Sequence, residues 1–236
     1  MTTMLNKSQF KDLNEFLAKH SAKNEQKTNS TSIISHTRIG DKQQNIYAGA
    51  YVIPKEELST FYSLYYESVF DNKKREYLTE KQLENSGPLV VDFDFRYRHD
   101  IAARQHTEEH ITDMICCYLD ELKKYFLFNG DTKFYVYIFE KPNVNRLEDG
   151  SLTKDGIHMI MGIQVDHTMQ VMIRENLLKE IERLWADLPL INDYESVLDE
   201  GISKGTTNWQ LFGSRKPGNE AYELSHYYHV IFDTAD

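Results

Sequence analysis

Cysteine is scarce in this sequence, and its two cysteines, Cys116 and Cys117, are adjacent. Adjacent thiols cannot join distant segments, so a disulfide framework and a four-cysteine zinc site are both excluded. The chain also lacks the glycine-rich loops G-x-G-x-x-G and G-x-x-x-x-G-K-[ST], which argues against a Rossmann cofactor site and a Walker ATPase. No apolar run reaches membrane-spanning length, and residues 1–11 lack the order of a secretory signal. We therefore expect an intracellular protein with no membrane partner.

Positive charge is also in deficit, with 27 basic against 37 acidic residues and a net charge of −10. This balance argues against broad nonspecific binding to nucleic acid, so any contact with phosphate must be local. Three groups of basic residues are candidates, and each is also typical of a solvated surface. They are Lys73, Lys74 and Arg75, then Arg96, Arg98 and Arg104, and finally Lys204, Arg215 and Lys216.

The chain has 236 residues, 40% of them hydrophobic, which is enough to form a substantial core in one or two domains. Apolar periodicity predicts helices from Ser8 to about Lys19, over 55–70, from Thr107 to about 126 and over 169–185. It predicts strands around 90–96 and over 134–139, 157–163 and 208–212, with a hairpin candidate at Gly40-Asp41. These elements favour an α+β fold in which helices pack on one face of a mixed sheet.

The strand around Val90-Val91-Asp92-Phe93-Asp94-Phe95 carries two carboxylates on one face. Successive side chains alternate between the faces, so Asp92 and Asp94 are neighbours opposite an apolar row. Two anions about 7 Å apart along a strand repel each other unless solvent, a cation or a metal compensates them. A solvated sheet edge would also explain the pattern.

A second motif is Lys154-Asp155-Gly156-Ile157-His158. In an extended strand, Lys154, Gly156 and His158 share one face, and the glycine leaves room for a ligand to approach the backbone. A lone histidine on a strand is more often structural, but the nearby lysine favours an anion site.

A third motif begins at Val197-Leu198-Asp199 and ends in the turn Gly213-Ser214-Arg215-Lys216. Exposed turn amides, a hydroxyl and two cations suit a triphosphate, although a basic surface turn is the alternative.

In this order, the motifs resemble those of the archaeo-eukaryotic primase superfamily, and within it the primase-polymerase branch that includes the helicase-primases of large DNA viruses. The resemblance runs from about Leu89 to Lys216. It implies an RRM-like palm and a template-dependent nucleotidyltransferase, a DNA primase or primase-polymerase. Such an enzyme makes primers for DNA replication on single-stranded DNA from NTPs or dNTPs.

The resemblance also implies a domain organisation and a location. We expect residues 1–85 to form the N-terminal helical and αβ part of the primase domain, and residues 86–236 to form the catalytic palm core. A helicase domain would follow in a longer helicase-primase, and a viral protein of this kind would work in the host cytoplasm.

The resemblance assigns the metal site to three carboxylates. Asp92 and Asp94 match the first motif of the superfamily and Asp199 matches its third, so together they would hold Mg²⁺ or Mn²⁺. Both ions prefer oxygen ligands, which agrees with three aspartates and no cysteine or histidine pair at metal spacing.

The nucleotide site is assigned in the same way. His158 matches the histidine that contacts the phosphates of the incoming nucleotide, and Lys154 matches a nearby basic position. Ser214, Arg215 and Lys216 fall where relatives meet the triphosphate. The resemblance thus implies that Asp92, Asp94, Asp199 and His158 form the catalytic set, and that Lys154, His158, Ser214, Arg215 and Lys216 bind nucleotide.

Two positions depart from the superfamily pattern. Gly156 stands where many members have a small hydroxyl residue, and Gln210 stands where an arginine is common. If those groups matter for nucleotide affinity, other residues such as Arg215 must complete the site.

Two other functions stay open from the sequence. Metal-dependent glycosyltransferases also use Asp-x-Asp at a strand end, but such an enzyme would leave the Lys-x-Gly-x-His strand unexplained. A noncatalytic docking module that binds nucleic acid with a primase fold is the alternative from a different class.

Overall fold

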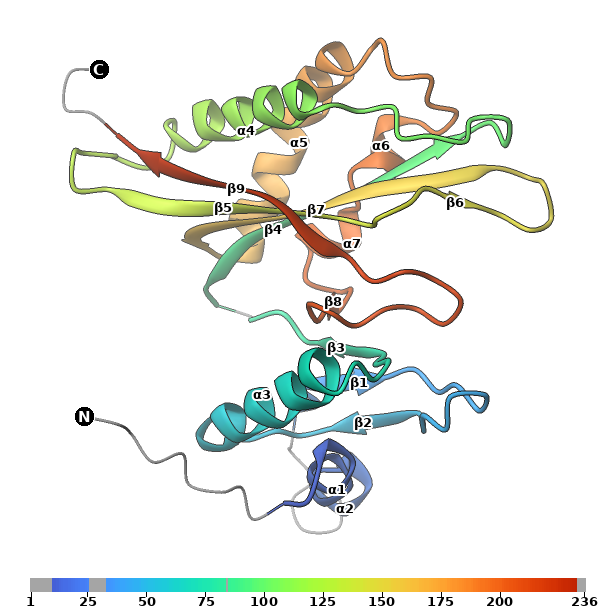
Figure 1. Ribbon diagram of the computed structural model, residues 1–236. Helices are drawn as coiled ribbons and strands as arrows, with labels where there is room; N and C mark the ends of the chain where they lie inside the picture. Colours follow the sequence, from blue (N-terminus) through green and yellow to red (C-terminus); the bar gives the residue numbers. More distant parts are fainter. Residues whose placement is uncertain (1–9, 26–32, 84, 233–236) are drawn as a thin grey trace. The chain divides into compact units, whose positions relative to one another are not determined.

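The computed structural model describes residues 10–25, 33–83 and 85–232 (Figure 1). The chain divides into two compact units, and each is described by itself. Unit 1 comprises Met1–Lys81 and Asn208–Ala221, and unit 2 comprises Gln82–Thr207 and Tyr222–Asp236. The sequence-based division placed a single boundary after residue 85. The structure has it after residue 81, and residues 208–221 return to unit 1.

Unit 1 is a small antiparallel sheet with helices. Its strands are β1 (His36–Arg38), β2 (Gly49–Tyr51), β3 (Leu78–Glu80) and β8 (Trp209–Gln210), paired in the order β2-β1-β3-β8. Its helical segments are α1 (Leu13–Lys19), α2 (Ala22–Glu25), α3 (Leu58–Tyr66), a 3₁₀ turn η1 (Lys55–Glu57) and a π-helical turn η2 (Glu67–Asp71).

Helix α1 begins where Asp12 accepts a hydrogen bond from the Glu15 amide at 3.0 Å, as an N-cap aspartate does. Ser8, which the sequence suggested as the start of this helix, lies outside the described residues. Phe16 from α1 and Phe61 from α3 are fully buried with Leu78 in the core of the unit.

Unit 2 contains the larger sheet and the longer helices. Its strands are β4 (Gly87–Tyr97), β5 (Lys133–Glu140), β6 (Asn145–Arg146), β7 (Thr153–Val165) and β9 (Glu223–Ile231). They pair antiparallel in the order β4-β7-β5-β9, and β6 pairs with the start of β7. Its helices are α4 (Glu108–Leu122), α5 (His167–Leu184), α6 (Tyr194–Val197) and α7 (Glu200–Ser203).

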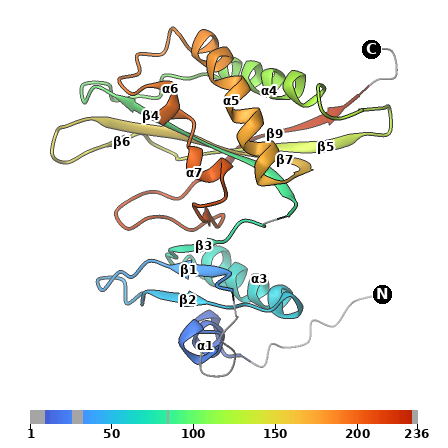
Figure 2. The same ribbon diagram turned by 180° about the vertical axis from the view of Figure 1, so that it is seen from behind.

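The two long helices of unit 2 cover one face of its sheet (Figures 1 and 2). Thr107 caps α4 in a reciprocal arrangement with His110, and Asp166 caps α5 by accepting a hydrogen bond from the Met169 amide at 2.8 Å. The apolar stripes of both helices pack on the inward row of β4 and β7, which includes Phe93 and Ile157. The opposite face of the sheet carries no long helix among the described elements.

The α+β class expected from the sequence is confirmed, and the helices lie on one face as expected. Among the described residues, no helix combines the length and the apolar character that crossing a membrane requires.

Candidate active site

The site begins with the pairing of β4 and β7. Asp92 lies opposite His158 and Asp94 opposite Gly156 in an antiparallel register, so the two sequence motifs share one face of the sheet. The intervening residues Phe93 and Ile157 are fully buried on the helix side. Alternation along the strands therefore turns the carboxylates and the imidazole to the face opposite the helices, here called the open face.

The imidazole of His158 meets the first carboxylate directly. Its Nε2 lies 3.4 Å from Oδ1 of Asp92, and His158 is only 8% exposed. This contact with the carboxylate favours one orientation of the largely buried imidazole ring.

Lys154 lies further along the same strand. It faces Arg96 across the β4–β7 pair, and it is exposed. Four residue steps of extended strand separate it from His158, a distance of about 13 Å. The open face thus carries carboxylates next to the imidazole and a pair of cations beyond the glycine.

Tyr222 is a member of this site that the sequence analysis did not identify. Its ring stacks on the His158 ring, with centroids 3.6 Å apart and an interplanar angle of 20°. Its hydroxyl lies 3.2 Å from the place where a Cβ on Gly156 would stand. Burial raises the pKa of Tyr222 well above its ordinary value, and the charges of Asp92 and Asp94 raise it further. The phenol is therefore neutral at physiological pH and covers the glycine.

Asp199 reaches the site through the free edge of β4. Its backbone amide donates to the carbonyl of Asp92 at 3.0 Å, and Leu198 forms a bridge with Phe93. The Asp199 carboxylate caps α7, because its Oδ1 accepts a hydrogen bond from the Ile202 amide at 3.0 Å. The third aspartate is thus fixed beside the first by main-chain contacts.

Two residues outside the predicted set hold this edge in place. Asn192 accepts a hydrogen bond from the Arg96 amide at 3.0 Å and donates to the Asp94 carbonyl at 2.9 Å. Arg174 on α5 is 2% exposed and donates to the Leu198 carbonyl at 2.9 Å. Each of these side chains bonds to backbone groups far away in sequence, so local patterns gave no signal for the contacts.

A buried ionic cluster lies on the helix side of the same strands. Arg104 pairs with Asp155, and His106 Nε2 lies 2.7 Å from Glu140 Oε1. Burial alone would raise the pKa of Glu140, but hydrogen bonds with His106 and Ser225 and the charge of Arg104 lower it to about 2. The cluster fixes β5 and β7 behind the open face.

The remaining predicted residues lie in unit 1. Contrary to the exposed turn expected at residues 213–216, Ser214 is 1% exposed, and its hydroxyl contacts the Tyr65 hydroxyl at 2.9 Å and accepts from the Leu78 amide at 3.1 Å. The turn needs Gly213, which has a positive φ of 86°, and Leu211 is buried beneath it. Lys216 is exposed and Arg215 is half-buried.

Metal binding at this site depends on how its carboxylates are placed. Among the described residues, no group of three or more His, Cys, Asp or Glu side chains is placed to hold a metal ion. Asp92 and Asp94 do offer oxygen ligands on one face, with the Asp199 backbone adjacent. The residue types fit a hard divalent cation, whereas the Asp199 side chain is engaged as a helix cap.

The fold and the site together describe an α+β domain that carries paired carboxylates and a histidine on the open face of an antiparallel sheet. The family model described as "C962R protein N-terminal AEP domain" matches residues 41–228, more than half of the chain. The chain therefore belongs to this family of archaeo-eukaryotic primase domains.

A relative agrees with that assignment. The chain is 30% identical over 223 residues to "Putative helicase L207/L206" of Acanthamoeba polyphaga mimivirus. The alignment covers 93% of this chain but only 22% of the relative, so the chain spans about a fifth of that protein's length.

Proposed function

We propose that the chain is a template-dependent nucleotidyltransferase, a DNA primase or primase-polymerase that makes primers from NTPs or dNTPs on single-stranded DNA. The observation that carries this proposal is the strand register that sets Asp92 and Asp94 beside His158 on the open face. Membership of the AEP family supports the same chemistry.

Asp92, Asp94 and Asp199 are the proposed ligands for Mg²⁺ or Mn²⁺. Divalent ions held there would activate the attacking 3′-hydroxyl and neutralise charge on the leaving pyrophosphate. Asp199 caps α7 through Oδ1, so Oδ2 would be the oxygen of this carboxylate that holds an ion.

The neighbouring side chains are proposed to hold the triphosphate. His158 can donate a hydrogen bond to a phosphate oxygen, and Tyr222 keeps its ring in place by stacking. Lys154 lies with Arg96 further along the same face, where two cations suit the far end of the triphosphate. Gly156 lies between them, across from Asp94.

In unit 1 we propose Arg215 and Lys216 as further triphosphate contacts, on the strength of the family resemblance. Ser214 is not included, because its hydroxyl is buried and already bonded within the unit.

We also propose a helicase part in the same longer protein, since the relative is named a helicase and the chain aligns with only 22% of it.

The test is product formation. The chain is incubated with a single-stranded DNA template, labelled NTPs or dNTPs, and Mg²⁺ or Mn²⁺, and the products are separated by length. Short oligomers that require the template support the proposal and show which sugar is used. Absence of both product and metal-dependent nucleotide binding would instead favour a docking module, and preferential binding of a sugar nucleotide would favour a glycosyltransferase.

A further inference from the structure

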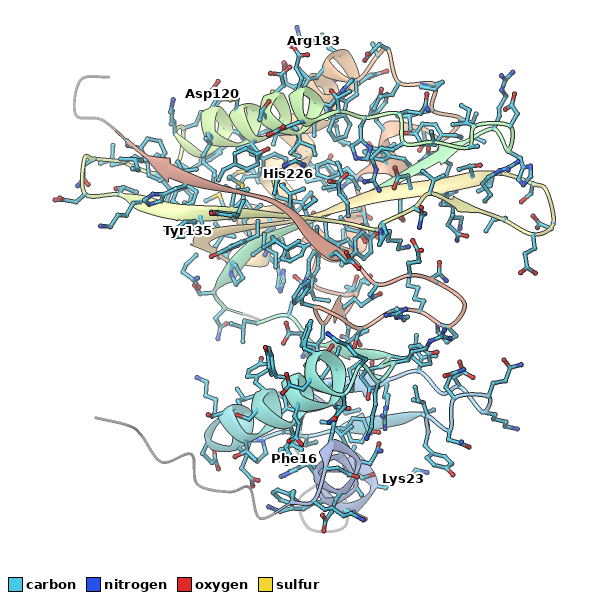
Figure 3. The ribbon with its side chains drawn as sticks, viewed as in Figure 1. Phe16, Lys23, Asp120, Tyr135, Arg183 and His226 are labelled. Atoms are coloured by element: carbon cyan, nitrogen blue, oxygen red, sulfur yellow. The ribbon has the colours of Figure 1, made fainter. Side chains whose placement is uncertain are left out.

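The open face continues beyond the candidate active site onto β5 and β9. By alternation and register, the side chains on this part of the open face are Lys133, Tyr135, Tyr137 and Phe139 from β5 and Leu224, Tyr227, His229 and Ile231 from β9. We call this set the aromatic face. Tyr227 is 67% exposed, Tyr135 42% and Tyr137 36%, so large rings are in contact with solvent. Figure 3 shows Tyr135 on the side of the sheet away from α4.

The rings of the aromatic face are ordered against one another. The Tyr135 ring stacks on His229, with centroids 4.6 Å apart and planes 15° apart. It also stacks on Tyr137 at 5.9 Å and 25°, and lies 6.5 Å from Tyr227. A contiguous patch of exposed rings marks an interaction site more often than single exposed rings do.

The open face also carries few acidic side chains. Among its residues in the described strands β4, β5, β7 and β9, the carboxylates are Asp92 and Asp94, although the whole chain has 37 acidic residues. The aromatic face carries Lys133 and no carboxylate. An anionic polymer would therefore meet no carboxylate on this part of the sheet.

The aromatic face adjoins the active site through the strand register. Phe139 lies opposite both His158 and Leu224, and Tyr137 lies opposite both Ile160 and Tyr227. Tyr137 and Tyr227 thus occupy the cross-strand row next to the row of Asp92 and His158, and Tyr135 lies one row further along β5. A DNA strand that leaves the proposed metal site along β5 would pass over them.

We propose that the aromatic face binds the single-stranded DNA template by stacking of its bases on Tyr135, Tyr137 and Tyr227. This inference rests on the proposed function and names the surface that would hold its template. Bases stack on aromatic side chains without regard to sequence, as a template site requires. With a net charge of −10, the chain gains little from general attraction to phosphate, so stacking supplies most of the binding.

The test measures binding without nucleotide or metal. A fluorescent single-stranded oligonucleotide is titrated with the parent chain, with the double variant Tyr135→Ala/Tyr227→Ala, and with Tyr135→Phe/Tyr227→Phe, by anisotropy. The alanine variant is expected to bind at least about tenfold more weakly, whereas the phenylalanine variant keeps the rings and binds within about twofold of the parent. Tyr47→Ala is the matched control, because Tyr47 is a 77% exposed tyrosine of unit 1.

The outcomes of this test distinguish a failure of the proposed template surface from a failure of the proposed activity. If the parent does not bind single-stranded DNA, or if the alanine variant binds as well as the parent, the aromatic face is not the template site, whether or not the parent makes oligomers. If the alanine variant loses DNA affinity while the parent makes no product, the surface is supported and the proposed activity is not. Binding by stacking also predicts a shallow dependence on salt, and a steep dependence that is identical in parent and variant would contradict it.

Discussion

At the scale of single residues, the site depends on a glycine and a tyrosine that come from distant parts of the chain. A Cβ at Gly156 would stand 2.5 Å from the backbone oxygen of Phe93, so a side chain there would push β4 away from β7. The Tyr222 hydroxyl lies over the same position at 3.2 Å. The small hydroxyl residue common in the superfamily is thus sterically excluded, and a phenol from elsewhere covers its place.

Replacing Tyr222 tests its positioning role for His158. Tyr222→Ala removes the stacked ring, so the imidazole loses the contact that holds its orientation, and kcat/KM for the nucleotide is expected to fall about tenfold or more. Tyr222→Phe keeps the ring and should retain most of the activity. Steady-state kinetics separate the effect on KM, which reports phosphate binding, from that on kcat. An alanine variant with parental kinetics and a parental melting temperature would contradict the role.

At the scale of elements, Asn192 closes the outer edge of β4 by bonding to the backbone of Arg96 and Asp94. We expect Asn192→Ala to release this edge, destabilising unit 2 by about 1 to 2 kcal/mol, because two backbone groups lose their partner. The amide of Arg96 should then exchange its hydrogen markedly faster. Hydrogen exchange read by mass spectrometry measures this, with peptides from β9 as the internal control. Unchanged exchange across β4 would show that Asn192 does not hold the edge.

The sequence predicts the elements whose signals are local. Helices α4 and α5 have apolar stripes and polar N-caps, and strands β5 and β7 coincide with apolar runs. Each was therefore expected close to its observed range. The pairing of Asp92 with His158 was only implied by the family resemblance, because strand register is a nonlocal property.

The sequence did not predict the elements that are fixed by tertiary contacts. No strand was expected over 223–231, although alternation of Tyr227 and His229 with the partly buried Tyr228 gives a period-two signal in retrospect. Ser214 was expected in an exposed turn, and its burial follows from contacts with Tyr65 and Leu78 that no local pattern shows. Tyr222 likewise meets His158 only because β9 returns to the edge of the sheet.

At the scale of the whole molecule, two units with separate cores can respond differently to pH. In unit 1, burial lowers the pKa of His36 from 6.5 to about 4, and its Nε2 has no hydrogen-bond partner among the described residues. Its folded-state pKa lies below the unfolded value, so the unfolded chain binds more protons between those two values. The stability that comes from the neutral imidazole is therefore complete above about pH 6.5 and is lost as the pH falls toward 4.

We accordingly expect unit 1 to lose about 3 kcal/mol of unfolding free energy between pH 6.5 and 4 through His36. In unit 2, Glu140 acts at lower pH: its folded pKa of about 2 keeps its contribution intact down to about pH 4.5 and removes it below. Urea unfolding followed by hydrogen exchange at several pH values measures each unit. In His36→Gln the slope of stability against pH between 6.5 and 4 should be smaller, whatever its absolute stability. An unchanged slope would show that His36 does not cause it.

We propose that the carboxylates on the open face of unit 2 hold the metal ions for nucleotidyl transfer. The most direct measurement compares template-dependent oligomer synthesis by the parent chain, by Asp94→Asn and by Asp120→Asn. Asp120 is the matched control because it is an exposed aspartate on α4, on the other side of the sheet (Figure 3). We predict that Asp94→Asn abolishes synthesis while keeping the parental melting temperature, and that Asp120→Asn is as active as the parent. Retained synthesis in Asp94→Asn would contradict the account.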